Sequence, residues 1–147
     1  MREILFKAKR IDNGEWVEGS LIDLYADSVY CCIVPTFKSP STLPFSWLVA
    51  DRMALVVPET LCQFTGLCDK NGNKIWENDI VNHNGEYAPV KFGRYCSSFD
   101  YGKCNLGFYV DFPEETFFRK DIGWWYRKVE VAGNIFDNKE LLQEVPE

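Results

Sequence analysis

The side chains most able to do chemistry lie in residues 117–129, FFRKDIGWWYRKV, where cationic and aromatic residues alternate. The cations are Arg119, Lys120, Arg127 and Lys128, and the aromatics between them are Trp124, Trp125 and Tyr126. Such a set can stack on bases and neutralise phosphates, as in sites that bind single strands. It can equally form a protein hot spot, because Trp, Tyr and Arg are enriched there. A structural interpretation is also open, in which alternate aromatics face the core and the charges solvate a hairpin.

The balance of charge separates the two binding interpretations. The chain has a net charge of −6 and a pI near 4.9, which opposes a polyanionic partner. We therefore expect a protein partner or a second copy of the chain, and regard nucleic acid as the alternative. Charges interrupt the apolar runs near the N-terminus, and no run approaches the ~18 apolar residues of a membrane helix. We expect a cytoplasmic protein with no membrane partner.

Catalytic chemistry has little support in the sequence. His83 is the only histidine, and its context NHNGEY predicts a solvent-exposed loop. Pairing it with a thiol would need a nucleophile context that none of the cysteines has. Glu114 and Glu115 could suggest a glycosidase, but adjacent residues of a strand point to opposite faces. We expect no enzyme and no catalytic residue.

The six cysteines are expected to be reduced thiols, because the chain shows no export signal. They are Cys31, Cys32, Cys62, Cys68, Cys96 and Cys104. No pair has the C-x2-C spacing that makes a zinc site convincing. Cys62 with Cys68, and Cys96 with Cys104, could still meet across hairpins as a four-thiolate site. Free cysteine is a common small core residue, so we favour no metal and no cofactor.

The segment TGLCDKNGNKIWENDIV, residues 65–81, has an oxygen-rich spacing that is similar to a calcium loop. An EF-hand loop needs Gly at its sixth position and Glu at its twelfth. Counted from Asp69, Gly72 is fourth and Ile80 is twelfth, so the pattern fails. We expect a tight turn instead, with positive φ at Gly72. Asp79 should cap the next turn, before Ile80 and Val81 point inward.

The patterning that must position these residues is almost entirely β-type. Alternating residues 3–10 and 16–22 flank Asn13-Gly14, which predicts a hairpin. Further strands are expected at 28–34, 54–57, 79–81, 88–95 and 106–112, and a strand, a bend at Gly133 and a strand end over 123–138. The periodicity of residues 45–57 fits either a strand or a helix, and the end of this segment, residues 54–57 before Pro58, favours a strand. Short helical turns are expected at 58–66 and 138–145, and a loop at 97–105.

Three blocks of the chain resemble one protein family, the YopX family, whose members are encoded mainly in bacteriophages and prophages. The blocks are REILFKAKRIDNGEWVEGSLI, PETLCQFTGLCDKNGNKIWENDIV and VEVAGNIFDNKELL, at residues 2–22, 58–81 and 129–142. Asn78 stands where the family commonly has glycine, which suggests a left-handed backbone that asparagine can also adopt.

The resemblance implies a mainly β protein of two small subdomains packed as one unit. The first would span residues 1–57, and the second, 58–147, would be an SH3-like barrel with a short C-terminal helix. No activity and no catalytic residue come with the resemblance. The matching positions are explained as turn makers and core: Thr65, Gly66, Leu67, Asp69, Asn71, Gly72, Asp79, Gly133, Asn134 and Ile135. Exposed strand edges also make a homo-oligomer an expectation.

Overall fold

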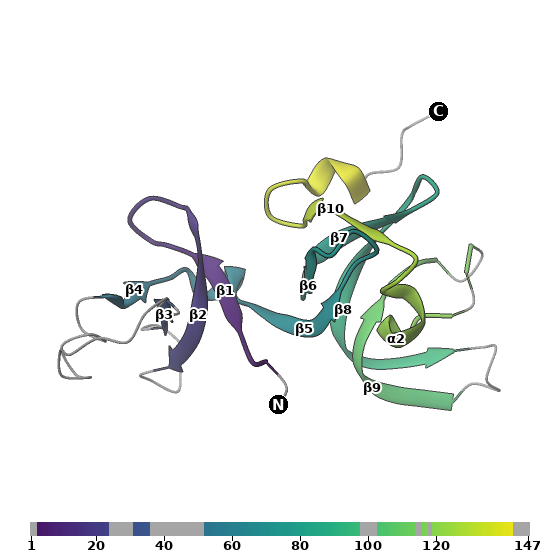
Figure 1. The fold of residues 1–147 in the computed structure, drawn as a ribbon, viewed down its shortest axis with the longest axis horizontal. Helices are drawn as coiled ribbons and strands as arrows, with labels where there is room; N and C mark the ends of the chain where they lie inside the picture. Colours follow the sequence, from purple (N-terminus) through teal and green to yellow (C-terminus); the bar gives the residue numbers. More distant parts are fainter. Residues whose placement is uncertain are drawn as a thin grey trace. The chain divides into compact units, whose positions relative to one another are not determined.

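The computed structural model describes residues 3–23, 31–35, 52–97, 103–113, 116–117 and 119–142 (Figure 1). The fold is mainly β, as the sequence predicted, with antiparallel strands throughout the described pairs. The chain divides into two compact units, Met1–Phe64 and Thr65–Glu147. Within the described part of the chain, no helix is both long and apolar enough to cross a membrane.

The first unit is a sheet with the strand order β4-β3-β2-β1-β5. Its elements are β1 (Phe6–Lys9), β2 (Trp16–Asp23), β3 (Cys31–Pro35), β4 (Ala54–Leu55), the 3-10 turn η1 (Pro58–Thr60) and the start of β5 (Cys62–Cys68). Gly14 has φ 72° in the β1–β2 hairpin, where the sequence predicted the turn. Ala8, Ile33 and Val56 are fully buried and form the core.

Strand β5 belongs to the first unit at its start, because the Phe64 N–H donates to the Leu5 carbonyl over 2.9 Å. Residues 58–64, which we expected in the second subdomain, therefore lie with the first unit. The helical turn expected over 58–66 ends at Thr60, and the prediction was wrong beyond it. Pairing of Cys62 and Gln63 with β1 holds that stretch extended.

The second unit contains a four-stranded sheet of order β10-β7-β8-β9, and β6 pairs with the end of β5 (Figure 1). The elements are β6 (Lys74–Trp76), β7 (Asp79–His83), β8 (Glu86–Ser97), β9 (Lys103–Val110), α2 (Ile122–Trp125), β10 (Glu130–Asn134) and the 3-10 turn η3 (Lys139–Leu142). The SH3-like barrel is not confirmed, since no sheet of the described strands closes on itself. The outer side of β9 meets an isolated bridge, Tyr109 to Asp121, and not a further strand.

One apolar cluster forms the core of the second unit. Its buried members are Ile75, Val81, Ala88, Val90, Val110, Phe112, Trp125 and Val129. Most of them come from strands β6, β7, β8 and β9 and from α2. The helical turn α2 lies beside β9. The core therefore holds α2, and the residues around it, in one place on the sheet.

Some expectations lie outside the described residues. These are the strand at 28–30, the segment 45–51, most of the loop at 98–102, and Glu114 with Glu115. The described ends of the expected loop are strand: β8 continues to Ser97 and β9 begins at Lys103, because the two strands pair along their whole length.

Candidate functional site

The strand with a bend that we predicted over residues 123–138 is confirmed in β10 (Glu130–Asn134), whose register shifts between Val131 and Gly133. The first part of the prediction was wrong, because Ile122–Trp125 form the helical turn α2. The Tyr126 N–H donates to the Ile122 carbonyl over 3.0 Å, and the Val129 N–H to the Trp125 carbonyl over 3.2 Å. Neighbouring side chains on a helical turn point about 100° apart. Trp124 is 41% exposed, whereas Trp125 is 3% exposed.

Trp125 anchors α2 to the core. Its indole N–H donates to the Arg119 carbonyl over 2.7 Å, and its ring lies 4.9 Å from the rings of both Phe112 and Phe117. Burying the ring while satisfying its N–H explains why this stretch turns here. Periodicity alone could not decide which of the two tryptophans faces outward.

His83 lies in the same aromatic cluster, and the expected solvent-exposed loop histidine was wrong. It is the last residue of β7 and is half-buried, with its ring 5.1 Å from that of Trp125 and 5.5 Å from that of Phe117. Its Nδ1 lies 3.1 Å from the Lys128 carbonyl oxygen. A carbonyl only accepts, so Nδ1 carries the proton and donates. His83 thus supports the turn that follows α2.

Trp124 is the centre of a surface that we call the Trp124 surface, formed by Arg119, Trp124, Tyr126, Arg127 and Lys128. The Arg119 guanidinium lies 4.4 Å and the Lys128 ammonium 3.9 Å from the Trp124 ring centroid. Lys128 also donates to the Trp124 carbonyl over 3.0 Å. Arg127 lies 5.2 Å from the Tyr126 ring. These are cation–π distances, so the cations and the exposed indole hold one another in place.

Lys120, the remaining predicted binding cation, points elsewhere. Its ammonium lies 3.4 Å from the Asp111 carboxylate, which also pairs with Lys91 over 2.8 Å. Burial alone would raise the pKa of Asp111, but the two lysines outweigh it, and its pKa lies below the ordinary value. Lys120 therefore belongs to an ion-pair network and not to the Trp124 surface.

The oxygen-rich segment, which the sequence predicted to be a tight turn, is organised around the Asp69 carboxylate, which accepts several backbone N–H groups. Asp69 is 6% exposed and accepts from the backbone N–H groups of Asn71, Asn73 and Val131 over 2.9, 2.9 and 2.8 Å. Donor hydrogens occupy the places that a cation would need. Asp69 thereby connects the turn to β10, 62 residues further along the chain.

The neighbouring turn residues have conformations that fit structural roles. Gly72 and Asn78 have φ of 85° and 70°, in the left-handed region. Asp79 accepts from the Trp76 N–H over 2.9 Å, and Ile80 and Val81, which follow it, are fully buried.

Other matched positions also hold turns or strand ends together. The Thr65 hydroxyl donates to the Ile75 carbonyl over 2.7 Å, and Gly66 has φ 87°. Asn134 accepts from the N–H groups of Phe136 and Asp137, each over 2.9 Å.

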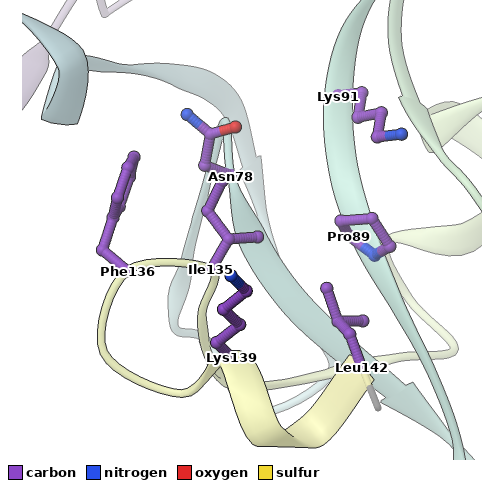
Figure 2. Close-up of a pocket in the computed structure, with 7 residues that line it drawn as sticks. All are labelled: Asn78, Pro89, Lys91, Ile135, Phe136, Lys139 and Leu142. Atoms are coloured by element: carbon purple, nitrogen blue, oxygen red, sulfur yellow. The ribbon is translucent and has the colours of Figure 1, made fainter. Parts of the chain in front are cut away.

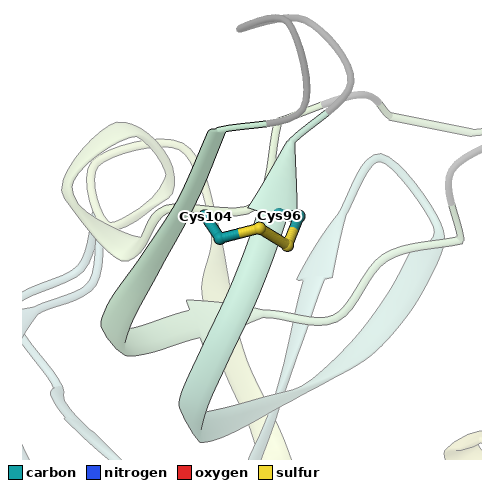
Figure 3. Close-up of a disulfide and its surroundings, with 2 residues drawn as sticks. All are labelled: Cys96 and Cys104. Atoms are coloured by element: carbon teal, nitrogen blue, oxygen red, sulfur yellow. A yellow bond between two sulfur atoms is a disulfide. The ribbon is translucent and has the colours of Figure 1, made fainter.

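The expectation of reduced thiols was wrong for one pair. Cys96 and Cys104 are directly opposite in the β8–β9 register and form a disulfide (Figure 3). Their sulfurs bond to each other, so they do not take part in a four-thiolate site with Cys62 and Cys68, which are not in a disulfide. The sequence signal was that the two cysteines lie at the ends of the segment predicted to be a loop. The β8–β9 register then brings them directly opposite each other.

Comparisons with known proteins identify a family and a similar solved structure. The family model described as "YopX protein" matches residues 5–143. The crystal structure of protein EF1440 from Enterococcus faecalis is similar with a TM-score of 0.56 and 23% identity, covering 97% of this chain and 100% of that one. At this identity the likeness concerns the fold. A comparison with curated proteins finds no match.

Proposed function

This chain belongs to the YopX family, and from that premise we propose that it is a non-catalytic accessory protein of phage or prophage type. In this proposal it works inside a bacterial host and binds a protein partner through the Trp124 surface. The observation that carries the proposal is an indole that is 41% exposed although the adjacent Trp125 is buried. An exposed Trp flanked by cations is the composition of a hot spot.

Pre-organisation supports the proposal. Trp124 is fixed at its backbone by α2, and its ring is held by Arg119 and Lys128. A side chain that is already ordered loses less conformational entropy when a partner binds. The rigid support comes from Trp125, whose ring and N–H are both engaged in the core.

The same contacts favour protein over nucleic acid. Arg119 pairs with Asp121 over 2.9 Å, and both Arg119 and Lys128 lie over the Trp124 ring. A base that stacks on this ring, or a phosphate that pairs with these cations, has to displace existing contacts. The net charge of −6 opposes a polyanion further.

Nucleic-acid binding is the second candidate, because Arg119, Arg127 and Lys128 gather around the exposed Trp124 ring and the half-buried Tyr126 ring. In that case affinity should fall steeply and linearly with the logarithm of salt concentration, through counterion release. A protein partner held by Trp124 should show a weak dependence on salt.

Self-association is a further form of the protein-partner proposal, and a specific surface favours it. Strand β9 is at the end of the four-stranded order, and Leu106 on it is 76% exposed. Phe92, on the same face of neighbouring β8, is 53% exposed. An apolar edge strand is a natural place for a second copy to pair.

The test is a pull-down with the tagged chain from lysate of the natural host, before and after prophage induction. It is run at low and high salt, with and without nuclease, using Trp124→Ala beside Tyr87→Ala. Tyr87 is the matched control, an exposed aromatic on β8 of the same unit, outside both the Trp124 surface and the face of Phe92 and Leu106. Any partner recovered is then purified and its affinity for each variant is measured by calorimetry.

We expect a discrete protein that survives nuclease and salt and binds Trp124→Ala at least about tenfold more weakly, the size of a moderate hot spot. Tyr87→Ala should bind like the unmodified chain. Retention of the partner by Trp124→Ala would contradict the proposed surface. Recovery of nuclease-sensitive material alone would favour the second candidate.

A further inference from the structure

The second unit contains a pocket of about 570 Å³ that is independent of the Trp124 surface (Figure 2). Pro89 and Lys91 on β8 form one wall, and Lys139 and Leu142 on η3 lie across from them. Small-molecule sites commonly have volumes of about 300–1,000 Å³. The pocket is therefore large enough for a compact organic ligand.

The walls are tied together by backbone hydrogen bonds, so the pocket is already formed. The Asn78 N–H donates to the Val90 carbonyl over 2.7 Å, and the Asn78 carbonyl accepts from the Ile135 N–H over 3.0 Å. Asn78 thus joins β8 to the segment that leads into η3. Beyond it, the Asn138 N–H donates to the Asn134 carbonyl over 2.9 Å and closes the turn that starts η3.

The lining has an apolar body and a cationic end. Pro89, Ile135, Phe136 and Leu142 supply carbon surface. The remaining lining residues are Asn78 and two lysines, and no carboxylate is among them.

The two lysines differ in what they already bind. The Lys91 ammonium lies 2.8 Å from the Asp111 carboxylate, which neutralises its charge. Lys139 has no ion pair within the part of the chain that the structure describes. Its ammonium is therefore the charge that a ligand could neutralise, and the Asn78 amide supplies a second polar group.

We propose that this pocket binds a small molecule that combines an apolar body with a carboxylate. The apolar body lies against Ile135, Phe136 and Leu142, and the carboxylate pairs with Lys139. Charge complementarity selects the anion, since both charged lining residues are cationic. An apolar pocket with few polar groups that fix orientation is the usual form of such a site.

The experiment is a titration of the full-length, isotope-labelled chain followed by backbone amide NMR shifts. The probes are 3-phenylpropionate and its neutral amide, 3-phenylpropionamide, which share an apolar body and differ in charge. Lys139→Gln removes the ammonium and keeps a polar stem. Lys103→Gln is the matched control, an exposed lysine on β9 outside the pocket. Trp124→Ala is titrated as well.

The acid should give saturable shifts confined to the lining segments and bind about tenfold more tightly than the amide, as expected for a charge-assisted hydrogen bond. Lys139→Gln should lower affinity for the acid to that for the amide, while Lys103→Gln and Trp124→Ala leave it unchanged. Equal binding of acid and amide would overturn the proposal in favour of a neutral apolar occupant. Shifts that do not saturate, or an affinity for the acid that is unchanged in Lys139→Gln, would also overturn it. None of these outcomes depends on the Trp124 surface.

Discussion

Replacing Asp69 with alanine should destabilise the protein by about 3–4 kcal/mol. The substitution removes the acceptor of the Asn71, Asn73 and Val131 N–H groups. Asn71 and Asn73 are exposed, so water can reach their amides, and each should cost about 1 kcal/mol, as for a lost cap. The Val131 N–H lies between β10 and the turn and should cost about 1–2 kcal/mol when it has no acceptor.

Asp69→Asn separates the two sides of this carboxylate. One oxygen, Oδ1, serves both Asn71 and Asn73, and the other, Oδ2, serves Val131. An amide that keeps its oxygen on the first side turns an N–H toward the Val131 N–H. We expect a loss of about 2 kcal/mol, which is smaller than for alanine because one acceptor is retained.

The pH dependence provides a second measure of the same group. Burial would raise the pKa of Asp69, but the hydrogen bonds from Val131, Asn73 and Asn71 outweigh it and lower the pKa. A lowered pKa means that the carboxylate stabilises the fold above the unfolded value of about 3.9. This contribution is lost as the pH falls through the lowered folded pKa. Asp69→Asn should lack that part of the acid dependence.

Urea unfolding followed by tryptophan fluorescence measures these losses, with m-values compared to check that the unfolding transition is unchanged. Asp12→Ala is the matched control, because Asp12 is an exposed turn aspartate paired with Arg10. It should leave the midpoint within error. A loss below about 1 kcal/mol for Asp69→Ala, the net value of a single ordinary hydrogen bond, would refute the reasoning.

Three further predictions concern packing, backbone conformation and assembly. Trp125→Ala should lower the free energy of unfolding by about 3–5 kcal/mol in urea, because it leaves a cavity in the core and removes the donor to the Arg119 carbonyl. A loss as small as that of a surface substitution would place this ring outside the core. Asn78→Ala should cost about 1 kcal/mol at φ 70° while Asn78→Gly is near neutral, and equal stability of the two would contradict the left-handed assignment. Light scattering at high concentration should exceed the 17.1 kDa monomer mass, and Leu106→Asp should return it to that mass; a monomer mass at every concentration would end the self-association idea.

Local sequence chemistry predicted much of the β-rich fold. Asn13-Gly14 between alternating runs is a short-range hairpin signal, and β1 and β2 pair around it. The segment before Ile80 predicted a turn with a capping aspartate, and the Asp79 carboxylate accepts from a backbone N–H three residues earlier. Such features depend on residues close together in the chain, so the sequence contains the information needed to place them.

Long-range contacts decided what local patterns could not. The two adjacent tryptophans have the same chemistry, and only packing against Phe112 and Phe117 buries Trp125 and leaves Trp124 exposed. The Cys96–Cys104 bond needs the β8–β9 register, which a one-residue slip would destroy.

The sequence by itself therefore determined the strand-rich class, the principal turns and the family. Tertiary structure alone decided that Ile122–Trp125 form a helical turn on the core and that Asp69 connects to Val131 across 62 residues. It also decided that Asn78 meets Ile135 at a pocket. The physical reason is that turns are stabilised by hydrogen bonds within a few residues. The direction in which a side chain points is set by the burial and hydrogen bonds that distant segments provide.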